Sequence, residues 1–111
     1  MIRHLVMWEL HDPAQASVFR DALLPCAQLV SGMRSYEVAS HSDALPASVH
    51  VSLIATFDDA DALQRYQAHP LHQEVSRRIG PLRKLRHVLD YEVAGERRAA
   101  GAQVPELNLG V

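Results

Sequence analysis

Hydrophobic and polar residues alternate along two segments of the chain, a pattern that predicts β-strands with one buried face. In 2–10 one face carries Ile2, His4, Val6, Trp8 and Leu10. In 49–57 one face is apolar, and the opposite face, formed by His50, Ser52, Ile54 and Thr56, has polar and apolar residues. Residues 86–93 are expected to form the last strand, and 33–40 are a weaker candidate for another. The pattern therefore predicts four strands.

Apolar residues at helical spacing fill the interval after the first strand. Asp12-Pro13 resembles an N-cap followed by proline at the first helical position. A helix is predicted from 13 to about 30, ended by Ser31-Gly32. Because Pro25 removes one backbone hydrogen bond, the helix is expected to bend near Asp21.

A second helical region follows the third strand. Asp58 or Asp59 is expected to cap it, with Leu63 and Tyr66 on one side. The helix breaks at His69-Pro70, where His69 is expected to cap the restart, and it resumes as far as Gly80-Pro81.

The order strand, helix, strand, strand, helix, strand is that of a split βαβ or ferredoxin-like α+β unit. We expect a four-stranded antiparallel sheet with the helices on one face, formed by a single domain over residues 1–94. From 95 to 111 the periodicity is lost, which indicates a tail, either disordered or packed on a partner subunit. The first strand is apolar in the middle of both faces, so we expect a homodimer that pairs the open sheet faces as a barrel.

Composition excludes several classes of partner. The 111 residues carry a net charge of −2, so no footprint for nucleic acid or an anionic membrane is present. No stretch approaches the ~20 apolar residues of a membrane span, and no secretory leader is evident. These features favour a cytoplasmic protein. Cys26, the single cysteine, cannot form an internal disulfide and is expected to pack as a small hydrophobe.

Four residues are candidates for chemistry: Tyr66, His69 and His72 around the helix break, and His4 in the first strand. Imidazole titrates at roughly 6.5 when unperturbed and can act as acid, base or metal ligand. The alternatives are that His72 lies on the helix surface, that His4 is a hydrogen-bonded core residue, and that Tyr66 is core packing. A metal site is not favoured, since no carboxylate or thiol completes a ligand pattern.

Several sequence runs together resemble the stress-responsive A/B barrel (Dabb) family. The similarity covers residues 2 to about 93, and its most specific part is the run Ala62-Leu63-Gln64-Arg65-Tyr66-Gln67-Ala68-His69-Pro70-Leu71-His72. Further runs are 1–8, 30–33, 53–57 and 88–92. The resemblance implies a dimeric α+β barrel.

Within that family the chain also resembles, more distantly, a plant polyketide cyclase that makes olivetolic acid. The resemblance implies that His72 acts as general base in ring closure, that Tyr66 holds the substrate carbonyl, and that His4 lines the same pocket. This sequence departs from the cyclase at Val51, which stands where the cyclase has a histidine, while His50 falls on the opposite face. The same substrate is therefore not implied.

Three functions remain open. The first is a cofactor-independent cyclase, isomerase or lyase for a small apolar carbonyl compound, without metal, which an apolar cavity above ~300 Å³ with His72 and Tyr66 pointing into it would favour. The second is a non-catalytic stress-response or ligand-binding barrel, in which the same residues line a cavity or merely pack, and a filled space there would favour it. The third, a cofactor-free monooxygenase or haem-binding barrel, has no sequence feature in its favour. For the first, the substrate-binding residues are predicted to be Val6, Trp8, Val51, Leu53, Leu63 and His69.

Overall fold

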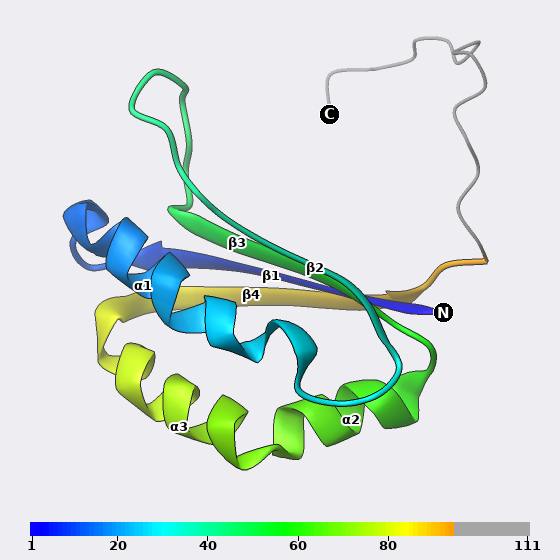
Figure 1. The fold of residues 1–111 in the computed structure, drawn as a ribbon. Helices are drawn as coiled ribbons and strands as arrows, with labels where there is room; N and C mark the ends of the chain where they lie inside the picture. Colours follow the sequence, from blue (N-terminus) through cyan, green and yellow to red (C-terminus); the bar gives the residue numbers. More distant parts are fainter. Residues whose placement is uncertain (95–111) are drawn as a thin grey trace, which may run out of the picture.

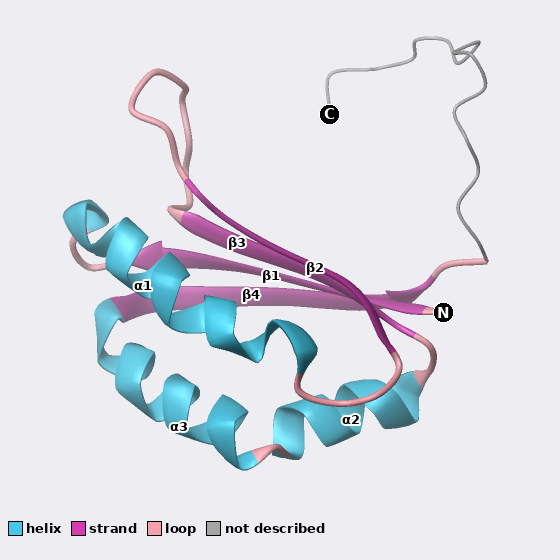
Figure 2. Cartoon of the chain, in the orientation of Figure 1, coloured by secondary structure: helices cyan, strands magenta, loops and turns pink. Residues whose placement is uncertain are grey.

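In the computed structural model, which describes residues 1–94, four antiparallel strands form one sheet (Figure 1). The sheet order is β2-β3-β1-β4. The strands are β1 (Ile2–Leu10), β2 (Met33–Ser40), β3 (Val51–Phe57) and β4 (Arg83–Glu92). The helices all cover the same face of this sheet, and no helix of residues 1–94 covers the opposite face, hereafter the open face (Figure 2). The predicted ferredoxin-like fold is confirmed, and the predicted tail, 95–111, lies outside the described residues.

Within residues 1–94, three α-helices and three short 3₁₀ turns make up the helical layer. The helices are α1 (Ala16–Leu23), α2 (Ala60–Ala68) and α3 (Pro70–Ile79). The 3₁₀ turns are Pro13–Gln15, Leu24–Gln28 and Gly80–Leu82.

The prediction of one continuous helix over 13–30 is wrong. The α-helix ends at Leu23 and the chain continues as the 3₁₀ turn Leu24–Gln28. Pro25 lacks the N–H that would bond the carbonyl of Asp21, so it ends the α-helix instead of only bending it. Gly32, at a φ of 92°, then turns the chain into β2, a conformation that favours glycine.

Two predicted strand boundaries also differ from the structure. β3 begins at Val51 and not at residue 49, because the Leu10 backbone N–H, which would face residue 49 in the β1–β3 register, donates to the Nδ1 of His50 instead. β4 begins at Arg83, three residues before the predicted start, because its pairing with β1 continues to Leu10 through a register shift after Glu9.

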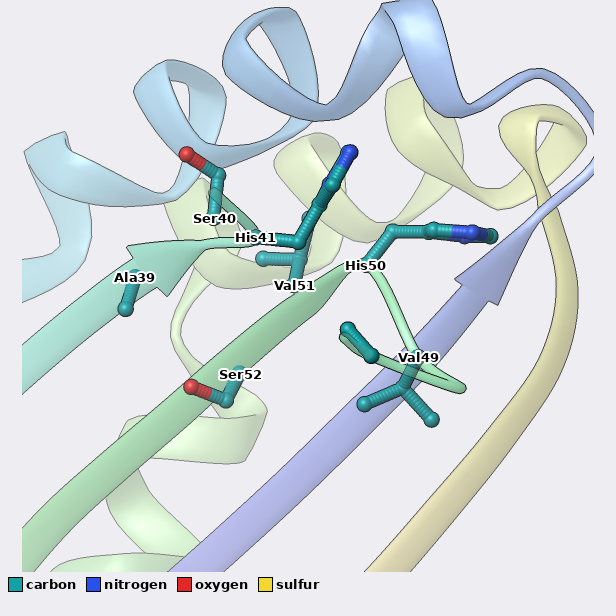
Figure 3. A pocket seen from close by; sticks show the side chains of 8 residues that line it. Ala39, Ser40, His41, Val49, His50, Val51 and Ser52 are labelled. Atoms are coloured by element: carbon teal, nitrogen blue, oxygen red, sulfur yellow. The ribbon is translucent and has the colours of Figure 1, made fainter. Parts of the chain in front are cut away.

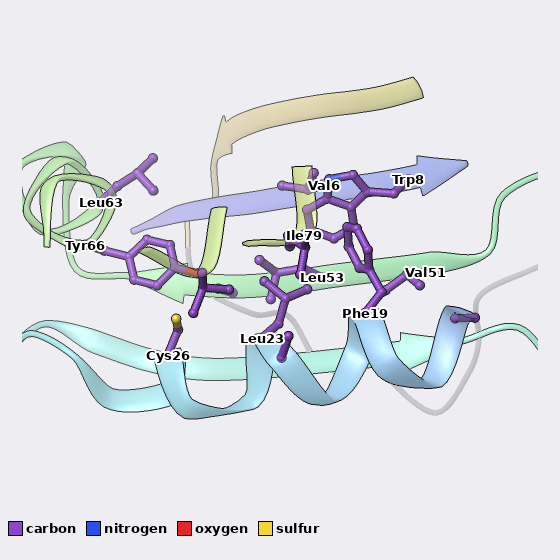
Figure 4. Close-up of a cluster of buried hydrophobic side chains, with 14 of the residues drawn as sticks. Val6, Trp8, Phe19, Leu23, Cys26, Val51, Leu53, Leu63, Tyr66 and Ile79 are labelled. Carbon is purple, nitrogen blue, oxygen red and sulfur yellow. The ribbon is translucent and has the colours of Figure 1, made fainter. Parts of the chain in front are cut away.

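The core lies between the helical layer and the sheet, and Figure 4 shows its central part. The predicted inward face of β1 is confirmed, since its buried residues include Val6, Trp8 and Leu10. The Trp8 ring packs on Phe19 of α1 with ring centroids 5.0 Å apart. Cys26 is fully buried, as expected for a small hydrophobe.

The open face of the sheet carries an apolar row across three strands. Strand register places Leu5 of β1 between Ile54 of β3 and Leu89 of β4. On β4, Leu85, Leu89 and Tyr91 are exposed large hydrophobic side chains. Within residues 1–94, no helix has the length and apolar character needed to cross a lipid bilayer.

Candidate functional site

A cavity of about 60 Å³ lies between the helical layer and the sheet. Its polar lining includes His4, Tyr66, His72, Ser76, Arg83 and Arg86, and its apolar lining includes Val6, Trp8, Leu23, Leu53 and Ile79. Every strand except β2 contributes to it. The cavity is smaller than the ~300 Å³ of typical ligand pockets and is lined by polar as well as apolar side chains. Among residues 1–94, the large apolar cavity that would favour an enzyme is therefore not present beside Tyr66 and His72, and this space suits a compact molecule.

Six of the residues predicted to form a site line this cavity: His4, Val6, Trp8, Leu53, Tyr66 and His72. Three others lie elsewhere. Val51 and Leu63 are buried in the core, and Val51 also lines a different pocket near His50. The His69 ring caps α3, because its Nδ1 accepts from the Leu71 backbone N–H at 3.0 Å. The predicted capping role of His69 is thus confirmed.

His72, on the first turn of α3, has a buried Nδ1 without a hydrogen-bond partner among residues 1–94. Its ring lies edge-on to that of Tyr66, with centroids 4.6 Å apart. Burial lowers the pKa of His72, as do the nearby His4 and Arg86, while the Gln67 backbone opposes this. The imidazole is therefore neutral at pH 7 and free to accept a proton.

Tyr66 belongs to a chain of hydroxyl groups beside the cavity. The Tyr36 hydroxyl donates to the Leu23 carbonyl at 2.9 Å and lies 3.2 Å from the Tyr66 hydroxyl. Since each hydroxyl has one proton, Tyr66 donates to Tyr36 in this arrangement. Burial raises the pKa of Tyr66 to about 12 and also raises the pKa of Tyr36, so both phenols are protonated at neutral pH.

His4 is 2% exposed and forms a hydrogen bond through Nδ1 to the carboxylate of Asp90, its register partner on β4. Its ring centroid lies 6.4 Å from that of Tyr66. The carboxylate fixes the orientation of the ring, so His4 forms a satisfied polar part of the wall. The arrangement agrees with the expectation of a hydrogen-bonded core histidine that also borders the cavity.

Sequence reasoning missed several lining residues. Ser76 and Ile79 stand four and seven positions after His72 on α3, so helical periodicity alone could have placed them on the same face. Arg86 enters the lining because strand register sets it beside Trp8. No local pattern along the chain signals that pairing.

A second pair of histidines lies at the base of the loop between β2 and β3 (Figure 3). His41 and His50 have ring centroids 5.2 Å apart and line a pocket of about 160 Å³. The Nδ1 of His50 accepts from the Leu10 backbone N–H at 2.9 Å, so this ring ties the loop to β1. In the part of the chain that the structure describes, no three His, Cys, Asp or Glu side chains are grouped to hold a metal ion.

Val51 and His50 occupy different environments in the structure. Val51 is 1% exposed on the helix-covered face, whereas His50 bonds to the backbone of β1. The cavity next to His72 therefore has no histidine from β3 in its lining.

Known proteins match this chain in sequence and in fold. An uncharacterised protein of Streptomyces coelicolor is 33% identical over 78 residues, which is 66% of this chain and 80% of that protein. A dimeric ferredoxin-like protein of unknown function from Thermobifida fusca has a TM-score of 0.73 at 21% identity, covering 83% of this chain and 90% of its own. SnoaB, a cofactor-independent oxygenase of Streptomyces nogalater whose structure was solved for a mutant, has a TM-score of 0.67 at 18% identity, covering 87% and 96%.

The two structural likenesses are below 25% identity and show the fold alone. The family profile of the Stress responsive A/B Barrel Domain matches residues 2–93, which include every strand and helix described above. This chain belongs to the stress-responsive A/B barrel domain family.

Proposed function

We propose that the cavity binds a small carbonyl compound and that His72 takes a proton from the carbon beside the carbonyl, without a cofactor. The observation that carries this proposal is the buried Nδ1 of His72 in the cavity region, which has no hydrogen-bond partner among the described residues 1–94. Buried polar atoms normally have hydrogen-bond partners, so a buried nitrogen without one beside a cavity is a candidate to bind a ligand there. A neutral imidazole has a free lone pair for this step.

Tyr66 supplies the second group. Its proton points to Tyr36 in the resting arrangement, and a rotation about the phenol C–O bond redirects it without moving the ring. The Tyr66 hydroxyl then donates to the substrate oxygen, where negative charge develops as the proton leaves carbon. His72 then returns the proton to another carbon in an isomerase, to the alkoxide formed by ring closure in a cyclase, or to the leaving group in a lyase.

The experiment is deuterium exchange into the methyl group of pyruvate in D₂O, followed by proton NMR at neutral pD. Abstraction at carbon by His72 forms an enolate, and return of a deuteron to the same carbon records each turnover. We expect the wild-type protein to accelerate exchange and His72→Ala to lose that acceleration with nearly unchanged melting temperature.

The control is His11→Ala, because His11 is exposed and does not line the cavity. Loss of exchange in His11→Ala as well would assign the rate to surface imidazole acting as a buffer. If His72→Ala lost stability together with deuterium exchange, His72 would be assigned a structural role.

The same proposal includes a homodimer built by the open faces of two sheets. Support comes from the exposed apolar row on β1, β3 and β4, and from the dimeric Thermobifida fusca protein of the same fold. Burying that row removes apolar surface from water, which stabilises a domain this small.

A non-catalytic ligand-binding or stress-response barrel is the second candidate. The observation in its favour is that the Tyr66 hydroxyl already has a partner and its side chain is fully buried. In that case pyruvate can shift the NMR signals of the His72 ring, which shows binding. The rate of deuterium exchange in the wild-type protein is then no higher than in His72→Ala.

A further inference from the structure

We propose that the ligand of the His72 cavity is an anion, a small oxo-acid whose acidic group is held by Arg86 and Arg83. This inference rests on the proposed function and names the class of its substrate. The inference goes beyond the proposed function because proton abstraction beside a carbonyl requires no charge on the substrate.

The cavity lining has one sign of charge. Arg83 and Arg86 of β4 both line it together with two histidines, and no Asp or Glu is among the lining residues. The cavity lining is therefore positively charged, although the whole chain has a net charge of −2. A wall of like charges attracts and orients an anion.

Neither arginine has an ion-pair partner in the part of the chain that the structure describes. Among residues 1–94, no carboxylate lies within salt-bridge distance of Arg83 or Arg86, although Arg20, Arg34 and Arg65 each have one. The carboxylate that accepts from His4 is that of Asp90. Guanidinium groups bind planar oxyanions through two parallel hydrogen bonds, so a free pair of them is suited to a carboxylate.

The positions of the cations order the ligand along the cavity. Strand register puts Arg86 beside Trp8 and Arg83 beside Leu10, towards the end of β1 away from His4. Arg86 is close enough to His72 to lower the pKa of that imidazole. An acidic group on Arg86 thus leaves the adjoining carbonyl next to His72 and Tyr66, whose rings are 4.6 Å apart. The small cavity, about 60 Å³, accommodates short oxo-acids better than long acyl chains.

The test compares pyruvate with pyruvamide, which has nearly the same shape and carries no charge. Binding is followed by titration against the His72 ring signals in NMR. We expect pyruvate to bind about tenfold more tightly at low salt, as charge-assisted hydrogen bonds exceed neutral ones. The advantage should shrink as salt is added.

Three variants locate the effect. Arg86→Gln should remove most of the preference for pyruvate, and Arg86→Lys should keep part of it, because lysine retains the charge but not the paired donors. Arg77→Gln is the matched control, since Arg77 is exposed on α3 and does not line the cavity. It should bind both compounds as the wild type does.

The outcomes separate this inference from the proposed function. Equal binding of the two compounds, each shifting the His72 signals, overturns the anion and leaves the carbonyl site intact. A preference for pyruvate that survives an Arg83→Gln, Arg86→Gln double substitution also overturns it. If neither compound moves the His72 signals while deuterium exchange is absent, both proposals are wrong.

Discussion

The two faces of the sheet differ in what they bury and in how they are completed. The helix-covered face packs Val6, Trp8 and Leu53 against the helical layer and leaves a small cavity edged by His4 and His72. The open face carries an apolar row centred on Leu5, interspersed with polar residues and without a helix above it. One face is completed by the chain itself, and on our proposal the other is completed by a second copy.

On our proposals, this difference places the reaction on one face of the sheet and dimer formation on the other. The orphaned Nδ1 of His72 is on the covered side, where protein already excludes water. On the open side, Leu89 is 56% exposed although it stands well inside β4. Exposed apolar patches of this kind mark association surfaces.

Leu5→Asp should have the largest effect, because it puts a charge into the centre of the open face. We expect aggregation or unfolding instead of a well-behaved monomer, measured by light scattering at micromolar concentration and by circular dichroism. Leu24→Asp is the control, since Leu24 is similarly apolar, exposed and on the helical layer. A folded Leu5→Asp monomer with the wild-type melting temperature would remove the basis for the barrel dimer.

Tyr36→Phe should have an intermediate effect, confined to the covered face. It leaves the Leu23 carbonyl without its donor and the Tyr66 hydroxyl without its acceptor. We expect a loss of about 1–2 kcal/mol in the free energy of unfolding, measured by urea denaturation, with the dimer intact. Deuterium exchange should persist, because the Tyr66 proton is then free to turn to the substrate; abolished exchange in a folded variant would contradict that role.

The smallest effect concerns the pH dependence of stability. Well above about pH 6.5 His72 is neutral both folded and unfolded, so its titration contributes nothing. As the pH falls through that value the unfolded chain gains a proton first, because the folded-state pKa is lowered, and the free energy of unfolding decreases. His72→Gln should therefore lose less stability than the wild type between about pH 7 and pH 5, measured by urea denaturation. A pH slope in His72→Gln equal to that of His11→Gln would show that His72 is not desolvated in the folded protein.

Much of the fold was predictable because alternation and capping are local properties. The inward face of β1 follows from period two, and Asp59 caps α2 by accepting from the Ala62 N–H at 2.9 Å, as its position before the helix indicated. The end of α1 was missed, since a proline within a helical pattern can either bend or end a helix and the sequence does not distinguish the two. The predictions that depend on local patterns were thus correct, whereas the end of α1 depends on a backbone conformation that the sequence pattern does not determine.

The candidate site was only partly predictable, for a different reason. Tyr66 and His72 are close in sequence, and their meeting could be expected from the helix break. Tyr36 and Asp90 reach the same region through packing and pairing between distant segments, with a separation of 30 positions from Tyr36 to Tyr66 and 86 from His4 to Asp90. Such contacts depend on strand register and on how the helical layer packs on the sheet, and no local pattern reveals either.

The break at His69-Pro70 decides whether Tyr66 and His72 can meet at all. In an uninterrupted α-helix each residue advances by about 100°, so side chains six positions apart point about 120° away from each other. Here His69 is extended, with φ −64° and ψ 136°, as a residue before proline prefers to be, and α3 restarts in a new direction. The helix break at Pro70 thus removes the rotational offset that would separate the two rings. The relative orientation of Tyr66 and His72 is therefore set by the position of one proline in the sequence.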